Sequence, residues 1–206
     1  MEALVEFKPL NIHSFFGDYK VVFDLSAFQK INEQLKDTNY FFIIDKNIVN
    51  LYSSSFSALK QNPRVLIIEA TETNKSLDKF CGYIESLVSM GIQRNHCLIA
   101  IGGGIIQDIS CFIAATLFRG LNWLFYPTTL LAQADSCIGS KSSINVGKIK
   151  NLLGTFTPPN EIIICTTFLQ TLKLDELKSG IGEMLKVHAI KGPNAFKEIA
   201  PCEICL

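Results

Sequence analysis

The 206-residue sequence predicts an α/β fold. Short apolar segments alternate along the chain with segments of helical periodicity, and several apolar segments are continuous enough to be strands buried on both faces. Strand, helix and strand at this spacing favour parallel pairing with right-handed crossovers. The expected architecture is a Rossmann-like, mostly parallel sheet with helices on both faces.

Six apolar segments are predicted to be strands. A helix is predicted between the third and fourth of them, because apolar residues from Leu77 to Val88 recur at the spacings of one helical face. The strands are YKVVFDL at 19–25, YFFIID at 40–45, RVLIIEA at 64–70, CLIAIG at 97–102, NWLFYP at 122–127 and EIIIC at 161–165.

Composition excludes several classes of protein. Lys and Arg total 19, as do Asp and Glu, so no large basic field is available to bind nucleic acid or an acidic membrane. The apolar runs are too short to cross a bilayer, and we expect no secretory signal. Seven scattered cysteines indicate reduced thiols in a cytoplasmic protein. The pair Cys202 and Cys205 lacks the second pair that a four-cysteine zinc site requires.

The loops that follow the strands are where ligands are expected, since open parallel sheets bind them beyond the carboxyl ends of their strands. The first loop, IGGGIIQDIS at 101–110, has three glycines and then a helix that contains Asp108. Glycines let the backbone approach a pyrophosphate closely, and a helix N-terminus attracts the anion. The alternative is a flexible turn, because the GxGxxG spacing is absent.

Two further loops carry polar residues. In FYPTTLLAQADS at 125–136, Thr128 and Thr129 offer hydroxyls that could bind a ligand or only cap a helix. In LKSGIGEMLKVHAI at 177–190, Glu183 and Lys186 share one helical face. The alternative for this pair is an exposed ion pair without a further role.

The stretch QADSCIGSKSSINVGKIKN at 133–151 is rich in hydroxyl, amide and lysine side chains, which face either water or a ligand. It directly follows the second loop. Its functional groups could therefore converge on whatever binds at the glycines, and the candidates are Asp135, Lys141, Lys150 and Asn151.

Together and in this order, these motifs resemble those of the 3-dehydroquinate synthases and the related sugar phosphate cyclases. The iron-dependent alcohol and glycerol dehydrogenases share the fold and the glycine turn, but the residues from Leu130 to Gln133 argue against them. The matching segments are the glycine turn with Asp108 at 102–108, FRG at 118–120, PTTLLAQADSCIGSK at 127–141, INVGKIKNLLG at 144–154 and LKSGIGEMLK at 177–186, with weaker matches at 43–52 and 72–77.

The resemblance implies a bound NAD and assigns residues to each part of it. Those near the nicotinamide would also surround the substrate and carry the chemistry. The implied residues are Asp45, Asn47, Glu72 and Lys75 at the adenosine part; Gly103, Gly104, Asp108, Thr128 and Thr129 at the pyrophosphate and nicotinamide ribose; and Asp135, Lys141, Lys150 and Asn151 at the nicotinamide and the substrate.

The resemblance also implies a metal site and a homodimer. Glu183 would be one of three ligands to zinc or cobalt, and Lys186 would contact a carboxylate or hydroxyl of the substrate. Arg119 would reach across the dimer interface to the phosphate of a substrate in the neighbouring subunit, which suits the forked guanidinium.

The implied activity is that of a lyase in the shikimate pathway of aromatic amino acid biosynthesis. A seven-carbon phosphorylated sugar acid, 3-deoxy-arabino-heptulosonate 7-phosphate, would become 3-dehydroquinate and phosphate through transient oxidation by NAD, elimination and aldol closure. The alternatives are a related cyclase that uses sedoheptulose 7-phosphate or glucose 6-phosphate, and a truncated NAD-binding module without activity.

The sequence departs from the family pattern at several positions. Gln107 stands where the family has glycine, Ser140 replaces the second glycine of Gly-Gly-Lys, and Ile149 replaces the glycine before Lys150. The family continues into a helical domain that supplies two histidine metal ligands. We therefore expect an NAD-binding domain at 1–172 and only the beginning of that all-helical domain at 173–206, with most of it missing.

Overall fold

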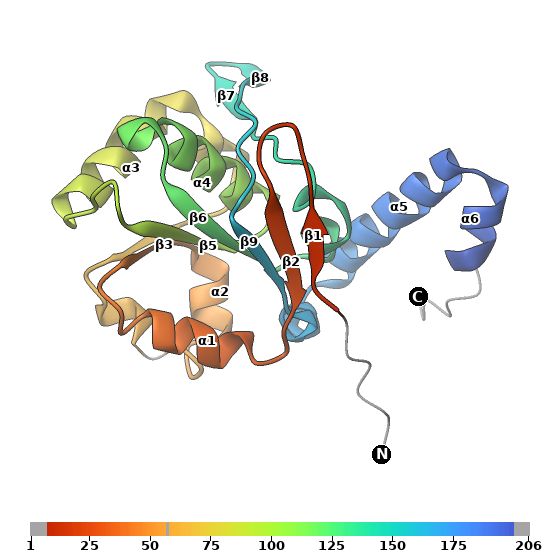
Figure 1. The fold of residues 1–206 in the computed structure, drawn as a ribbon, viewed down its shortest axis with the longest axis horizontal. Helices are drawn as coiled ribbons and strands as arrows, with labels where there is room; N and C mark the ends of the chain where they lie inside the picture. Colours follow the sequence, from red (N-terminus) through yellow and green to blue (C-terminus); the bar gives the residue numbers. More distant parts are fainter. Residues whose placement is uncertain (1–7, 57, 200–206) are drawn as a thin grey trace.

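A seven-stranded sheet forms the centre of the fold in the computed structural model, which describes residues 8–56 and 58–199 (Figure 1). The strand order is β1-β2-β9-β6-β5-β3-β4, and every neighbouring pair is parallel except β1 with β2. The predicted α/β class with a mostly parallel sheet is therefore confirmed. The strands are β1 Leu10–Ile12, β2 Tyr19–Phe23, β3 Tyr40–Asp45, β4 Val65–Ile68, β5 Cys97–Gly102, β6 Asn122–Pro127 and β9 Glu161–Ile164.

All six predicted strands are present, and the strands that the sequence did not reveal are short. β1 and the hairpin of β7 (Ile144–Val146) and β8 (Ile149–Leu153) have three to five residues per strand, and β8 is exposed along its whole length. These segments therefore lack the two sequence patterns that predict a strand, a continuous apolar run or an alternation of apolar and polar residues.

Helices cover both faces of the sheet, as predicted (Figure 1). α1 (Ala27–Gln34) and α2 (Lys46–Leu51) pack on one face, and α3 (Leu77–Ser89) and α4 (Gly104–Thr116) pack on the other.

The predicted helix after the third strand is α3, and its Phe80 and Leu87 are buried. Cys81 and Val88 were expected on the same apolar face, but both are exposed. Each lies one residue, and thus about 100°, further round the helix than its buried neighbour. The apolar stripe of α3 is therefore wider than the surface that meets the sheet.

Alternation along the central strands divides the core into two layers. In β3, Phe41 and Ile43 pack with the side chains of α3 and α4, whereas Phe42 and Ile44 pack with those of α1 and α2. All four side chains are buried, so this strand is apolar at consecutive positions. This is the physical reason that the segment appears in the sequence as a continuous apolar run.

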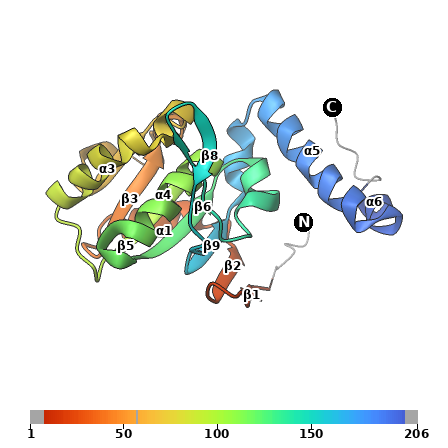
Figure 2. The ribbon, with the colours of Figure 1, turned by 90° about the horizontal axis from the view of Figure 1, so that it is seen from above.

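Two further helices, α5 (Leu174–Lys191) and α6 (Pro193–Ile199), project away from the sheet (Figure 2). α5 packs against a π-helical turn at Ala132–Ser136, which follows β6. Gly180 makes this contact possible, because a Cβ there would lie 2.6 Å from Leu130 Cβ. The proposed domain boundary between residues 172 and 173 stays a prediction.

The cysteines agree in part with the predicted reduced core thiols. Five described cysteines are free: three, among them Cys137, are buried, Cys97 is partly buried, and Cys81 is exposed. Burial raises the pKa of Cys97 and of Cys137 to about 12, which keeps both thiols protonated and weakly reactive. Cys202 and Cys205 lie outside the described residues. Within the described part of the chain, no helix combines the length and the apolar character needed to cross a membrane.

Gly180→Ala should weaken the docking of α5, because the added methyl group would lie 2.6 Å from Leu130 and 2.8 Å from the Leu131 nitrogen. We expect the free energy of unfolding, measured by urea denaturation, to fall by about 1–3 kcal/mol. Gly182→Ala in the same helix is the matched control, since no atom lies within 4 Å of its added Cβ. It should raise stability by up to about 1 kcal/mol, and equal losses in the two variants would contradict the close contact.

Candidate functional site

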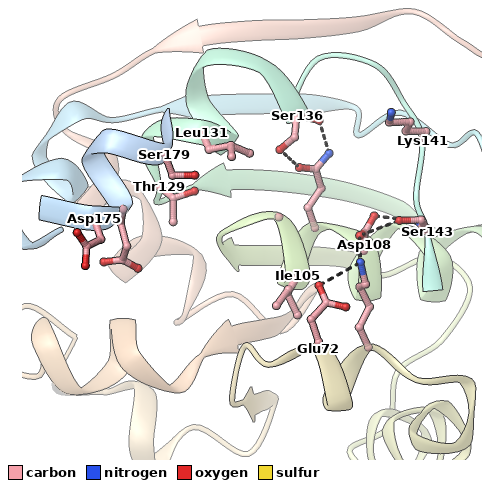
Figure 3. Close-up of a pocket in the computed structure, with 14 residues that line it drawn as sticks. Glu72, Ile105, Asp108, Thr129, Leu131, Ser136, Lys141, Ser143, Asp175 and Ser179 are labelled. Carbon is pink, nitrogen blue, oxygen red and sulfur yellow. Dashed lines mark hydrogen bonds and ion pairs between the residues drawn. The ribbon is translucent and has the colours of Figure 1, made fainter. Parts of the chain in front are cut away.

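Two adjacent cavities lie along the edge of the sheet where the parallel strands end. The larger has a volume of about 600 Å³ and the smaller a volume of about 250 Å³. Thr129 and Glu176 line both, so the two cavities share a wall. Side chains from the turn Glu72–Lys75, α4, the π-helical turn and α5 surround the larger cavity (Figure 3).

The three glycines at the end of β5 and the start of α4 serve close packing and access rather than flexibility. A Cβ at Gly102 would lie 2.5 Å from Ile106 Cγ1, and a Cβ at Gly103 would lie 3.0 Å from the nearest side-chain atom. Gly104 is different: the nearest atom to its added Cβ would be Ser136 Oγ, at 3.9 Å, and Gly104 lines the larger cavity. The N-terminus of α4 therefore opens onto the cavity, which suits an anionic ligand.

A buried lysine joins three segments of the chain beside the larger cavity. Lys75 Nζ lies 3.0 Å from Asp108 Oδ2 and 3.0 Å from Asn151 Oδ1. It also lies 3.7 Å from Glu72 Oε1 (Figure 3). The Lys75 side chain is only 7% exposed, so these protein oxygens replace most of its hydration. Lys75 thus ties the turn before α3 to α4 and to β8.

Ser143 and Asn145 hold the β7–β8 hairpin against this group. The Ser143 backbone N–H donates to Asp108 Oδ1 at 2.8 Å. The Asn145 amide donates to Glu72 Oε2 at 3.0 Å, and its oxygen accepts the Asn151 backbone N–H at 2.9 Å. The hairpin is therefore anchored by side-chain hydrogen bonds to both the turn and α4.

Two carboxyl groups of this network have pKa values shifted in opposite directions. Burial raises the pKa of Asp108, although the ammonium of Lys75 and the hydrogen bonds of Ser143 oppose the shift. The hydrogen bond from Asn145 lowers the pKa of Glu72. The ionised form of Asp108 therefore depends on its lysine partner.

The residues predicted at the adenosine part of NAD are divided between the two cavities. Asp45 and Asn47 line the smaller cavity, together with the buried Thr128, whereas Glu72 and Lys75 line the larger one. Asp45 Oδ1 also accepts the Asn47 backbone N–H at 3.0 Å and so caps the N-terminus of α2. Burial raises the pKa of Asp45.

The predicted metal ligand Glu183 forms an ion pair with Lys186 on α5, as the alternative interpretation expected, but only Lys186 is exposed, since the Glu183 side chain is 20% exposed. The hydrogen bond that Lys186 donates to Glu183 raises the pKa of Lys186, and the negative charge of Asp135 in the π-helical turn adds a smaller increase. His188 Nδ1 lies 2.8 Å from the carbonyl oxygen of Met184 in the same helix. Among the described residues, no three His, Cys, Asp or Glu side chains are grouped so that they could hold a metal ion.

Three predicted cationic residues occupy different places. Lys141 lines the larger cavity, whereas Lys150 lines a third cavity of about 330 Å³ beside the β7–β8 hairpin. Arg119 lies beyond the C-terminal end of α4, a helix of 13 residues that is about 20 Å long and begins at Gly104. Arg119 is thus at the opposite end of α4 from the cavity of its own chain.

The departures from the family pattern have structural consequences. Ser140, which stands where the family has glycine, has a φ of 64° and so adopts the left-handed region, as do three other described non-glycine residues, Phe118, Arg119 and Asn151. Gln107 is buried, lines the larger cavity and hydrogen bonds to Ser136.

Several lining residues were not singled out from the sequence, and they lie in the segment after the last predicted strand or, for Ser179, within the candidate loop at 177–190. Thr171 and Lys173 line the smaller cavity, and Asp175 and Ser179 of α5 line the larger one. β9 ends at the same edge as the other parallel strands, so the rule that led to the glycine turn also applies to these residues.

Comparison with known proteins places the chain among 3-dehydroquinate synthases. The family described as 3-dehydroquinate synthase N-terminal matches residues 65–179. The 3-dehydroquinate synthase of Streptococcus pyogenes is 33% identical over 197 residues, which are 93% of this chain and 55% of that protein. The enzyme of Staphylococcus epidermidis is 37% identical over 185 residues, 88% of this chain and 52% of that protein. The chain thus spans about half the length of the curated relatives it matches.

A solved structure of a sugar phosphate cyclase has the same fold. The 2-epi-5-epi-valiolone synthase of Streptomyces hygroscopicus, with NAD+ and Zn²⁺ bound, has a TM-score of 0.73 and is 27% identical. The similarity covers 91% of this chain and 51% of that one.

Ser140→Gly and Ser140→Ala both remove the Ser140 hydroxyl, but only glycine adopts a φ of 64° without steric strain. We expect the glycine variant to be about 1 kcal/mol more stable than the alanine variant in urea denaturation. At Ser110, inside α4, the order should reverse by about 1 kcal/mol, because glycine weakens a helix interior. Alanine more stable than glycine at both positions would show that the backbone at Ser140 is not strained.

Proposed function

The chain belongs to the 3-dehydroquinate synthase family, and we propose that it is the NAD-binding part of a carbon–oxygen lyase. The proposed reaction converts 3-deoxy-arabino-heptulosonate 7-phosphate to 3-dehydroquinate and phosphate. It proceeds by transient oxidation of a secondary alcohol, elimination of phosphate, reduction and aldol closure. We also propose that the protein is cytoplasmic and forms a homodimer.

The pair of adjoining cavities over the glycine turn is the observation that carries this proposal. An elongated dinucleotide needs two neighbouring spaces with an anion site beside them. Thr129 lines both cavities, and Gly104, the first residue of α4, lines the larger one. The NAD+ bound to the similar 2-epi-5-epi-valiolone synthase supports the same assignment.

The residues around these cavities fit the parts of NAD. Asp45 is a buried acceptor at the smaller cavity and would hydrogen bond to ribose hydroxyls, with Asn47 beside it. The amides at the start of α4 would meet the pyrophosphate, with Gly103 and Gly104 giving close access. When bound, NAD supplies a reversible acceptor of hydride for one secondary alcohol of the substrate.

The cationic residues of the larger cavity would meet the two anionic groups of the substrate. Lys141 faces this cavity, and its charge suits a phosphate or a carboxylate. Lys75 is already surrounded by protein oxygens, so we assign it to holding Asp108 and Asn151 in place beside the ligand. Arg119 would serve a neighbouring subunit, as its position beyond α4 allows.

The described residues do not fit a zinc or cobalt ion by themselves. Glu183 is paired with Lys186, and catalytic zinc sites use three protein ligands. We therefore derive no step through a metal. If Glu183 does bind one, its ion pair with Lys186 must open and other residues must supply the remaining ligands.

Measuring NAD+ binding tests the cofactor assignment. Asp45→Asn should weaken the affinity for NAD+ about tenfold, because a charge-assisted hydrogen bond to the ribose is lost. Asparagine keeps the cap on α2, so the fold should not change. NADP+ binding should change less, since its 2′-phosphate is already disfavoured by the carboxylate.

Asp37→Asn is the matched control for this measurement by isothermal titration calorimetry. Asp37 is exposed and accepts the Asn39 N–H at 2.9 Å, with the same two-residue spacing as Asp45 and Asn47, but it lies before β3 rather than after it. An equal loss of NAD+ affinity in both variants would argue against a ribose contact at Asp45.

The substrate is distinguished by binding to the chain loaded with NAD+. We expect 3-deoxy-arabino-heptulosonate 7-phosphate to bind about tenfold more tightly than sedoheptulose 7-phosphate or glucose 6-phosphate, because it adds a carboxylate that a lysine can pair with. Lys141→Ala should remove most of that preference, and Lys20→Ala on β2 is a distant control. If sedoheptulose 7-phosphate or glucose 6-phosphate binds more tightly instead, the result would favour a related cyclase. No binding of any of the three, with NAD+ still bound, would favour an inactive NAD-binding module.

A further inference from the structure

Gln107 joins two walls of the larger cavity through a pair of hydrogen bonds. Its Nε2 donates to the carbonyl oxygen of Ser136 at 2.5 Å, and its Oε1 accepts from Ser136 Oγ at 2.9 Å (Figure 3). Gln107 lies near the start of α4 and is 6% exposed, while Ser136 ends the π-helical turn. Both residues line the cavity, so this pair of hydrogen bonds, which we call the Gln107 clasp, links one wall of the cavity to the other.

The start and the end of the π-helical turn are held by different side chains. Near its start, Gln133 Nε2 donates to the carbonyl oxygens of Pro127 and Cys165 at 2.9 and 3.0 Å, which fixes the turn to the ends of β6 and β9. At its end, Gln107 makes the pair of bonds to Ser136. Since π-helical turns are rare and lie mostly at functional sites, a dedicated restraint at each end indicates a role in the site.

The end of the turn is also the part nearest to the proposed chemistry. Asp135, the residue predicted beside the nicotinamide and the substrate, directly precedes Ser136. α5 packs against the same turn and contributes Ser179 to the cavity. A shift of Ser136 would therefore move Asp135 and change the shape of the cavity.

We propose that Gln107 is a positioning residue that fixes the π-helical turn at a set separation from α4 and so preforms the larger cavity for its ligand. This role rests on the proposed NAD site. A ligand that enters a preformed cavity does not have to order the turn, so the clasp raises its affinity. A glycine at position 107, as in the pattern the sequence resembles, would leave the two walls unlinked at this point.

Gln107→Met tests the clasp, because methionine has a similar length, favours helix and makes neither hydrogen bond. We expect faster backbone hydrogen exchange across residues 132–138, measured by mass spectrometry, with exchange in β5 unchanged. NAD+ affinity should fall about fivefold, because the ligand would then have to order the turn as it binds. Gln29→Met is the matched control: its exposed amide on α1 bonds to Glu33 Oε1 at 3.1 Å, and neither measurement should change.

Ser136→Ala is the milder second variant, since it removes the hydroxyl but leaves the carbonyl bond. It should change exchange and affinity in the same direction as Gln107→Met, by smaller amounts. If hydrogen exchange at 132–138 is unchanged in Gln107→Met, the clasp does not restrain the turn. If exchange is faster but NAD+ affinity stays within twofold of that of the native chain, Gln107 makes a structural contact and is not a positioning residue. If the native chain itself does not bind NAD+, the proposed function fails, while the exchange measurement still tests the clasp.

Discussion

The arrangement around the larger cavity depends on the buried ion pair between Lys75 and Asp108. Lys75 is 7% exposed and burial raises the pKa of Asp108, so the ion pair offsets part of the cost of removing these groups from water. Their contact at 3.0 Å requires the turn before α3 to lie against the first turns of α4. Asn151 accepts from the same ammonium group and so ties β8 to the same point.

The β7–β8 hairpin shows how polar contacts position a segment that has little apolar surface to bury. β8 is exposed at every position, so the hydrophobic effect contributes little to its placement. Ser143, Asn145 and Asn151 instead hydrogen bond to each other and to the Lys75 group. Gly154 lets the end of the hairpin lie close to the backbone of Ser142, because a Cβ at position 154 would lie 2.0 Å from the carbonyl oxygen of Ser142.

The first turns of α4 carry three residues that together position the other segments around the larger cavity. Gly104 opens the helix N-terminus to the cavity, Gln107 binds the π-helical turn, and Asp108 binds Lys75. These three residues lie within five positions of each other on a helix that is packed firmly on the sheet. A rigid helix of this kind sets the positions of flexible neighbours more accurately than loops could set one another.

The sequence by itself determined the six apolar parallel strands, the helix-covered sheet and the family, because these follow from local periodicity and from motifs that are contiguous in the chain. It also identified Gly104, Asp108 and Lys141 as residues of one site. Only the tertiary structure decided that Lys75 pairs with Asp108 and Asn151, that Gln107 hydrogen bonds to Ser136, and that the residues predicted at the adenosine part divide between two cavities. Such contacts join residues 29 to 76 positions apart, and their geometry depends on how packed elements approach in space, which no local pattern encodes.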